Sequence, residues 1–102
     1  MNILDKIIAS KFDEVALRKQ RLTEAQLRES PLFSRPTISL KSFLLDPEKT
    51  GIIAEFKRKS PSKGIINDEA DVVEVTGAYV QHGASGISVL TDTDYFGGSS
   101  AD

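Results

Sequence analysis

Residues 51–57 read Gly51-Ile52-Ile53-Ala54-Glu55-Phe56-Lys57, an apolar run rich in β-branched residues that opens on a glycine. Such a run is typical of a strand buried in a parallel sheet. Residues 59–64 then read Lys-Ser-Pro-Ser-Lys-Gly, which is the chemistry of a turn. Residues 86–91, Gly-Ile-Ser-Val-Leu-Thr, have the same character as the first run. The sequence therefore predicts two buried strands.

A helix is predicted between these two strands. Residues 68–71, Asp-Glu-Ala-Asp, open it, because acidic residues are favourable near a helix N-terminus. Gly83 fits its C-terminal stop. The predicted apolar face consists of Val72, Val75, Ala78 and Tyr79. The order strand, loop, helix, strand is one βαβ unit, whose two strands run parallel.

The residues before this unit are predicted to be helical. A stripe with spacings of three and four indicates a first helix that Asn2 could cap. The stripe consists of Ile3, Leu4, Ile7, Ile8, Phe12, Val15 and Ala16. Residues 23–26, Thr-Glu-Ala-Gln, form a capping box for a short second helix. Ser39 is interpreted as the cap of a third short helix, which Asp46-Pro47 ends.

Composition excludes several classes of protein. The 102 residues are 39% hydrophobic and 27% charged, as in soluble globular domains. Cysteine is absent and His82 is the single histidine, so disulfides, thiolate metal sites and histidine metal clusters are excluded, and no metal site is expected. His82 is interpreted as a cation at a helix C-terminus. Neither a secretory signal nor a membrane span is indicated, so a cytoplasmic protein is expected.

The charge distribution argues against binding to nucleic acid. Residues 1–45 contain eight Lys/Arg and five Asp/Glu, a balance of +3, and residues 46–102 contain five and ten, a balance of −5. Neither part has the strongly basic footprint of a nucleic-acid binder.

The candidate chemistry lies where the first strand ends. Strand alternation places Glu55 and Lys57 on one side and Phe56 on the other. Burying a carboxylate and an ammonium group inside a sheet costs free energy, so such groups are expected to be paired with each other or to have a function. Ligands of α/β folds bind at the carboxyl ends of strands. A lysine there could bind an anionic substrate or transfer a proton, and Ser60 and Ser62 add hydroxyl groups near the same rim.

Plainer interpretations stay open from these residues alone. Residues 57–59, Lys-Arg-Lys, could be a solvated loop, a phosphate-binding patch or a nuclear-import signal. Glu55 and Lys57 could be an ion pair that only fixes the register of the strand.

Residues 53–64, Ile-Ala-Glu-Phe-Lys-Arg-Lys-Ser-Pro-Ser-Lys-Gly, closely resemble the first-strand signature of the indole-3-glycerol-phosphate synthase family. Residues 87–92, Ile-Ser-Val-Leu-Thr-Asp, and residues 95–99, Tyr-Phe-Gly-Gly-Ser, resemble its second-strand segment. Residues 3–8 and 36–40 are similar to its helical N-terminal extension. The resemblance thus covers essentially the whole chain, and its first block is highly specific.

The resemblance implies an α/β fold, the N-terminal part of a (β/α)8 TIM barrel. Residues 1–48 would be the helical N-terminal extension, and residues 49–102 the first two β-strands with their intervening helix. The implied reaction converts 1-(2-carboxyphenylamino)-1-deoxyribulose 5-phosphate into indole-3-glycerol phosphate by ring closure, decarboxylation and dehydration. No metal or organic cofactor would be needed.

The resemblance also implies roles for individual residues. Glu55 and Lys57 would be catalytic, Glu55 in the polar network and Lys57 as a substrate anchor or acid. Ser60, Pro61 and Ser62 would line the site of a phosphate-ester substrate. Phe96 would form part of the apolar wall for the anthranilate ring, although on its own it could equally be a loop anchor.

The chain is expected to be an incomplete barrel, because two parallel strands leave open sheet edges. The family's third-strand lysine, its later glutamate and asparagine and its phosphate-binding loops have no counterpart here. Negligible activity is therefore expected of the chain alone. The alternatives are another phosphate-binding barrel of the tryptophan or histidine pathways and a stand-alone module that self-associates through its sheet edges. A basic-loop nucleic-acid binder is disfavoured by the acidic balance.

Overall fold

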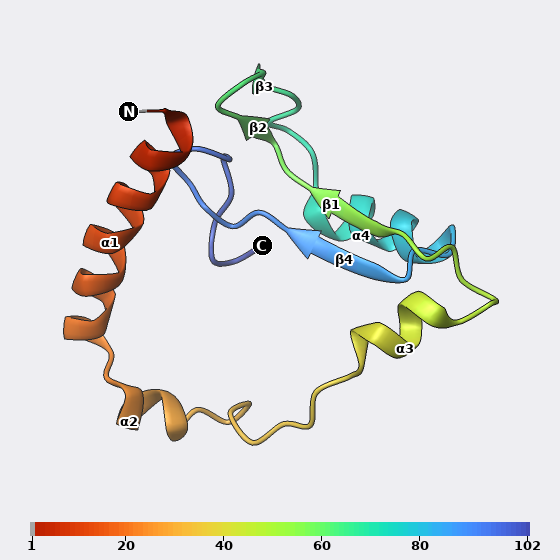
Figure 1. Cartoon of the computed structure of the whole chain (residues 1–102), viewed down its shortest axis with the longest axis horizontal. Coiled ribbons are helices and arrows are strands. Elements are labelled where there is room, and N and C mark those ends of the chain that lie inside the picture. Colours follow the sequence, from red (N-terminus) through yellow and green to blue (C-terminus); the bar gives the residue numbers. More distant parts are fainter. Residues whose placement is uncertain (1) are drawn as a thin grey trace. The chain divides into compact units, whose positions relative to one another are not determined.

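The computed structural model describes residues 2–102 as an α/β chain of helices and short strands (Figure 1). Two compact units divide the chain, one ending at Ile38 and the other spanning Ser39–Asp102. Among the described residues, no helix combines the length and the apolar character that a membrane crossing needs.

The first unit contains α1 (Ile3–Arg21) and α2 (Glu24–Arg28), and both begin as predicted. The Asn2 side chain accepts from the backbone N–H of Asp5 at 2.8 Å, and Thr23 accepts from that of Gln26 at 3.2 Å. Each cap is a reciprocal capping box. The apolar stripe of α1 exists, but none of its residues is buried, and Phe12 is 74% exposed.

The second unit is built on the predicted βαβ arrangement. β1 (Ile53–Phe56) and β4 (Gly86–Val89) are parallel neighbours, with Ile53 opposite Gly86 and Glu55 opposite Ser88. The bond from the Leu90 backbone N–H to the Phe56 carbonyl, at 3.0 Å, continues this ladder. Two parallel strands connected through a helix are confirmed.

The connecting helix α4 (Val72–Gln81) covers one face of this sheet (Figure 1). Val72, Val75 and Tyr79 are half-buried, as the apolar pattern predicts, whereas Ala78 is exposed. The Tyr79 hydroxyl donates to the Glu55 carbonyl at 3.4 Å. Phe56, 3% exposed, is the one buried hydrophobic side chain among the described residues.

The start of α4 differs from the prediction. The helix begins at Val72, and Asp71 caps it by accepting from the Glu74 backbone N–H at 3.1 Å. Asp68 and Glu69 precede the helix. The Asn67 side chain accepts from the Glu69 N–H at 3.1 Å, a local turn that competes with helical hydrogen bonding.

The short helix α3 (Leu40–Leu45) packs at the amino end of β4. Ser39 caps it through the Ser42 N–H at 3.1 Å, and it ends before Asp46-Pro47, as predicted. A Cβ added to Gly86 would lie 2.7 Å from Leu40 Cδ1, so a glycine there allows the close approach of α3.

Two further strands, β2 (Lys59–Ser60) and β3 (Gly64–Ile65), form an antiparallel hairpin where the sequence indicated only a turn. Strands of two residues are too short to show an alternating pattern. Gly64 has φ +68°, a left-handed conformation that glycine adopts readily. The Arg58 carbonyl accepts from the Ile66 N–H at 2.8 Å and closes the base of the hairpin.

Candidate functional site

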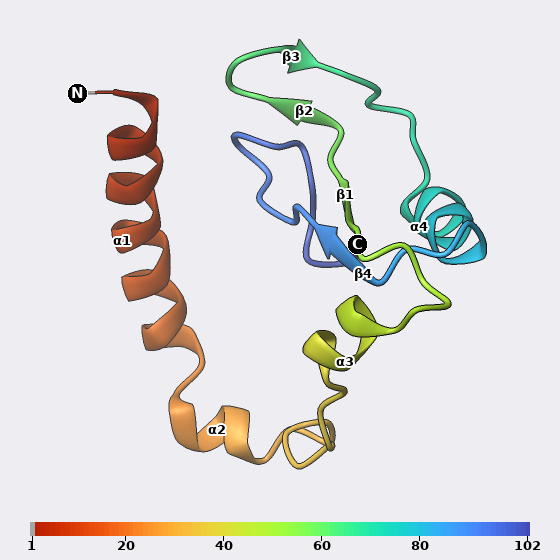
Figure 2. The ribbon, with the colours of Figure 1, turned by 45° about the vertical axis from the view of Figure 1, so that its right-hand side comes forward.

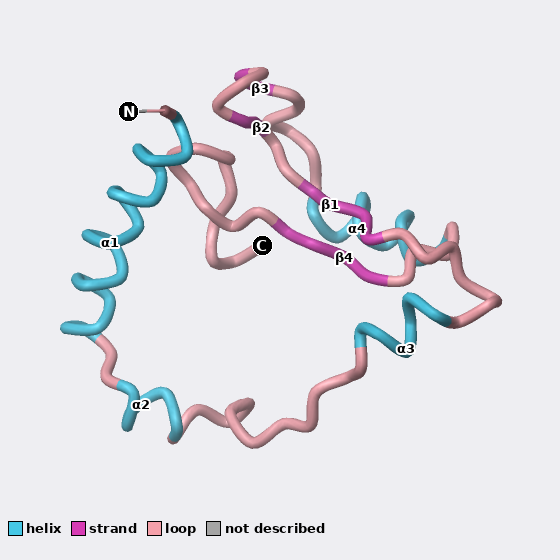
Figure 3. The backbone as a smooth tube through the Cα atoms, viewed as in Figure 1, coloured by secondary structure: helices cyan, strands magenta, loops and turns pink. Residues whose placement is uncertain are grey.

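The carboxyl ends of β1 and β4 lie at the same edge of the sheet because the two strands are parallel. Long loops leave both ends (Figure 3). Ala54 lines a pocket together with Ala78 and Tyr79 of α4, so α4 lies on the side of β1 opposite to Glu55, because successive strand residues alternate between faces. The polar residues predicted from the sequence therefore gather at the edge where α/β folds bind ligands.

Glu55 and Lys57 are brought together as strand alternation predicts. Lys57 Nζ lies 3.7 Å from Glu55 Oε1, and their side chains are 38% and 46% exposed. The Ser88 hydroxyl donates to Glu55 Oε2 at 3.1 Å. Glu55 thus links the cation of Lys57, directly after β1, to a hydroxyl donor on the neighbouring strand. Ser88 was not singled out from the sequence, although it is the polar residue within an otherwise apolar strand.

Ser60 is the last residue of β2, and Pro61 and Ser62 lie in the turn of the β2–β3 hairpin. Ser60 is 7% exposed, and its hydroxyl accepts from the Lys63 N–H at 3.2 Å. The Ser62 hydroxyl lies 3.4 Å from that of Ser60. Pro61 and Ser62 are exposed. Ser60 therefore holds the turn, while Ser62 offers a hydroxyl at its surface.

The loop after β4 turns back beside β2 (Figure 2). The backbone carbonyl of the half-buried Phe96 accepts a hydrogen bond from the Lys59 N–H at 3.3 Å. This bond joins the loop after β4 to the loop after β1. Gly97 has φ +69°, and a Cβ there would lie 3.1 Å from Lys59 Cγ. The loop that carries Phe96 is thus packed against β2, the strand that contains Lys59.

A second link joins the loop after β1 to the loop after β4, and it was not predicted from the sequence. Arg58 Nη1 and Nη2 donate to the two carboxylate oxygens of Asp102, at 2.5 and 3.0 Å. These hydrogen bonds are the main reason that the pKa of Asp102 is lowered and that of Arg58 is raised. The sequence carries no signal for this pair, because its members are separated by 44 positions.

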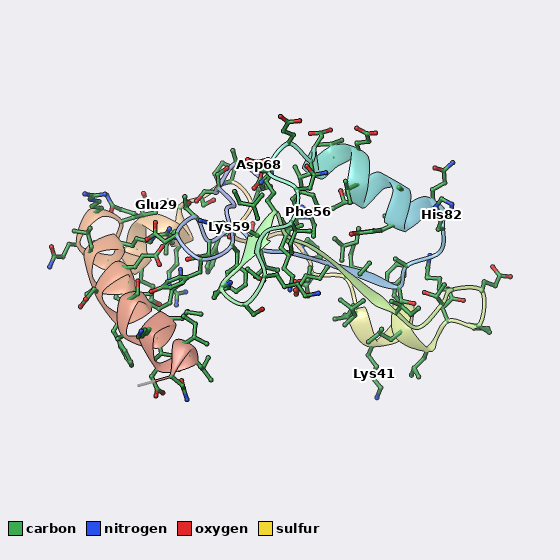
Figure 4. The ribbon with its side chains drawn as sticks, turned by 90° about the horizontal axis from the view of Figure 1, so that it is seen from above. Glu29, Lys41, Phe56, Lys59, Asp68 and His82 are labelled. Carbon is green, nitrogen blue, oxygen red and sulfur yellow. The ribbon has the colours of Figure 1, made fainter. Side chains whose placement is uncertain are left out.

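His82 lies at the C-terminal end of α4, as predicted, with Nδ1 2.8 Å from the Ala78 carbonyl oxygen. Figure 4 shows it apart from Phe56 and Lys59. Within residues 2–102, no group of three His, Cys, Asp or Glu side chains is arranged to hold a metal ion.

The fold and the site define a class: an α/β protein with paired acid, base and hydroxyl groups at the carboxyl ends of neighbouring parallel strands. A family profile described as indole-3-glycerol phosphate synthase matches residues 4–102. The chain belongs to this family.

Curated relatives bear the same description. A Bacteroides thetaiotaomicron indole-3-glycerol phosphate synthase is 46% identical over 99% of this chain and 38% of its own length. Proteins of that name from Bordetella pertussis and Dehalococcoides mccartyi are 39% and 41% identical, over 96% and 95% of this chain and 38% of their own lengths. The chain thus spans little more than a third of these relatives.

Proposed function

We propose that the protein containing this chain is an indole-3-glycerol-phosphate synthase of tryptophan biosynthesis, acting in the cytoplasm. Its substrate would be 1-(2-carboxyphenylamino)-1-deoxyribulose 5-phosphate. The aromatic carbon that bears the carboxylate bonds to the substrate carbonyl carbon, carbon dioxide leaves, and the hydroxyl left at the new bond departs as water. The observation that carries this proposal is the block of Glu55, Lys57 and residues 60–62 at the carboxyl end of β1.

The parent fold would be a (β/α)8 barrel. Residues 1–48 would be its helical extension, and β1 and β4 would be the first two barrel strands, within residues 49–102. Exposed apolar side chains on these strands support this arrangement: Ile53 is 48% and Ile87 is 38% exposed. The remaining strands and helices of the barrel would cover them. In the isolated chain, the same open edges would favour self-association.

The roles of the charged residues follow from their placement. Lys57 would bind the substrate carboxylate or protonate an oxygen during ring closure or dehydration. Glu55, held by Ser88 at 3.1 Å, would keep the ammonium group of Lys57 in place. The stabilisation of substrate charge by Lys57 would be strongest where water is excluded. We assign the exclusion of water to the remaining strands and helices of the barrel.

The loops would contact the rest of the substrate. Ser62, with Ser60 and Pro61 shaping its turn, would donate to a polar substrate group. Phe96 would provide an apolar surface for the anthranilate ring. The phosphate would be held by barrel loops beyond the residues described here, where backbone amides at helix N-termini commonly bind phosphate.

The proposal is tested by substrate turnover in the protein that contains this chain. Indole product is followed by fluorescence, and carbon dioxide release is measured in parallel. We expect equal amounts of both products. A folded protein that releases neither would reject the synthase assignment and favour another phosphate-ester substrate on the same barrel.

A further inference from the structure

We propose that Arg58 and Asp102 are positioning residues that clamp the loop after β1 to the loop after β4. The clamp would set the distance between the candidate substrate contacts Ser62 and Phe96. The expected effect of the clamp on KM rests on the proposed function, whereas the link between the two loops does not.

The geometry of the pair is that of a two-point link. Both terminal nitrogens of Arg58 reach the carboxylate of Asp102, one oxygen each. The two side chains are only 17% and 10% exposed. Planar, bidentate contacts of this kind fix orientation as well as distance.

Arg58 is itself held at two other points. Its Nε donates to the Ala70 carbonyl at 3.1 Å, just before α4 begins. Its guanidinium lies 5.0 Å above the ring of the buried Phe56. All three nitrogens are therefore engaged within the protein, so the structure assigns Arg58 to positioning and not to direct binding of an anion.

Asp102 organises the other loop. It also accepts from the Ser99 N–H at 3.0 Å, and its own N–H donates to the Ser99 carbonyl at 3.1 Å. This turn follows directly after the glycines that pack the loop against Lys59 and Leu90. The backbone bond from the Lys59 N–H to the Phe96 carbonyl joins the same two loops, directly after Arg58 in the chain, so loss of the clamp should loosen it first.

Hydrogen exchange tests the clamp without any assay of activity. In the protein that contains this chain, Arg58→Gln, Asp102→Asn and the double variant are compared with wild type. We expect the Lys59 amide to exchange at least about tenfold faster in each single variant, with no further acceleration in the double variant, because one link is lost in all three. Amides of β4 should be unchanged.

Arg28→Gln is the matched control, since it removes an exposed ion pair with Glu24 within α2. It should leave the Lys59 amide unaffected. An unchanged rate at Lys59 in the single variants, or accelerations that multiply in the double variant, would overturn the clamp.

Kinetics separate positioning from simple loss of folded protein. We expect Arg58→Gln to raise KM about tenfold and to change kcat less than about threefold, because substrate-contacting loops are displaced. A fall in kcat at constant KM would overturn positioning. If the wild type itself does not turn over the substrate, the proposed function fails, and exchange at Lys59 alone decides the clamp.

Discussion

At the scale of single residues, one glycine lets the loop after β4 fold back against its own strand. A Cβ at Gly98 would lie 2.1 Å from the Leu90 carbonyl oxygen and 2.8 Å from the Thr91 Cα. Both neighbours are backbone atoms, which cannot rotate away as a side chain could. Gly98 is also buried, and its N–H donates to the Asp92 carbonyl at 2.8 Å.

Gly98→Ala should therefore destabilise the protein that contains this chain by at least about 1–3 kcal/mol, the usual cost of overpacking. The measurement is urea unfolding. Gly77→Ala is the control with the opposite sign: nothing lies within 4 Å of its added Cβ, and it is helical, so a gain of roughly 0.5–1 kcal/mol is expected. Equal effects of the two substitutions would contradict the packing described here.

Alternation along one strand was sufficient to predict that Glu55 and Lys57 share a face. It could not predict that Ser88 would hydrogen-bond to Glu55, because this requires the register between two strands that a helix separates. The Arg58–Asp102 pair lies in loops, where no periodic pattern constrains the chain. Contacts within an element were thus predictable, whereas contacts between loops were not. The assigned roles of all six site residues stay predictions: Glu55, Lys57, Ser60, Pro61, Ser62 and Phe96.

At the scale of elements, the cap of α4 decides where the helix begins. Acidic residues occur at 68, 69 and 71, and charge alone does not distinguish among them. Asp71 has an extended backbone, and its side chain accepts from the Glu74 N–H, which satisfies one of the free donors of the first turn.

Asp71→Ala should cost about 1 kcal/mol of stability, and Asp71→Asn should restore most of this, because asparagine also caps. Asp68→Ala, an exposed acidic residue before the helix, should change stability by less than about 0.5 kcal/mol. Thermal unfolding of the three variants is the measurement. A larger loss of stability for Asp68→Ala than for Asp71→Ala would indicate that the helix begins at Asp68, as the acidic residues alone suggest.

Caps, apolar stripes and strand order were predictable for the longer elements because each has a local cause in the sequence. The hairpin of β2 and β3 was not, since its two-residue strands depend on bonds such as that between Ile66 and Arg58. The packing of α3 beside Gly86 also depends on residues far apart in the chain.

At the scale of the whole molecule, much apolar surface is exposed. Ile52 is 58%, Ile65 67% and Val73 74% exposed, and the chain spans 38% of the length of its relatives. Isolated two-stranded sheets are marginal.

We therefore expect the isolated 102-residue chain to have negligible synthase activity and to self-associate. Turnover and sedimentation, measured beside the longer protein, check both points. An ordinary enzymatic rate from a monomer of the isolated chain would show that the remaining barrel is not needed.

The most direct test of the active-site assignment compares Lys57→Met with Lys63→Met in the protein that contains this chain. Lys63 is an exposed lysine in the hairpin that follows β1. With indole product formation as the measurement, Lys57→Met should lower kcat/KM by about 100-fold or more, and Lys63→Met should stay within about threefold of wild type, as expected of a surface position. A folded Lys57→Met variant that also stays within about threefold of wild type would contradict a role for Lys57 in the reaction.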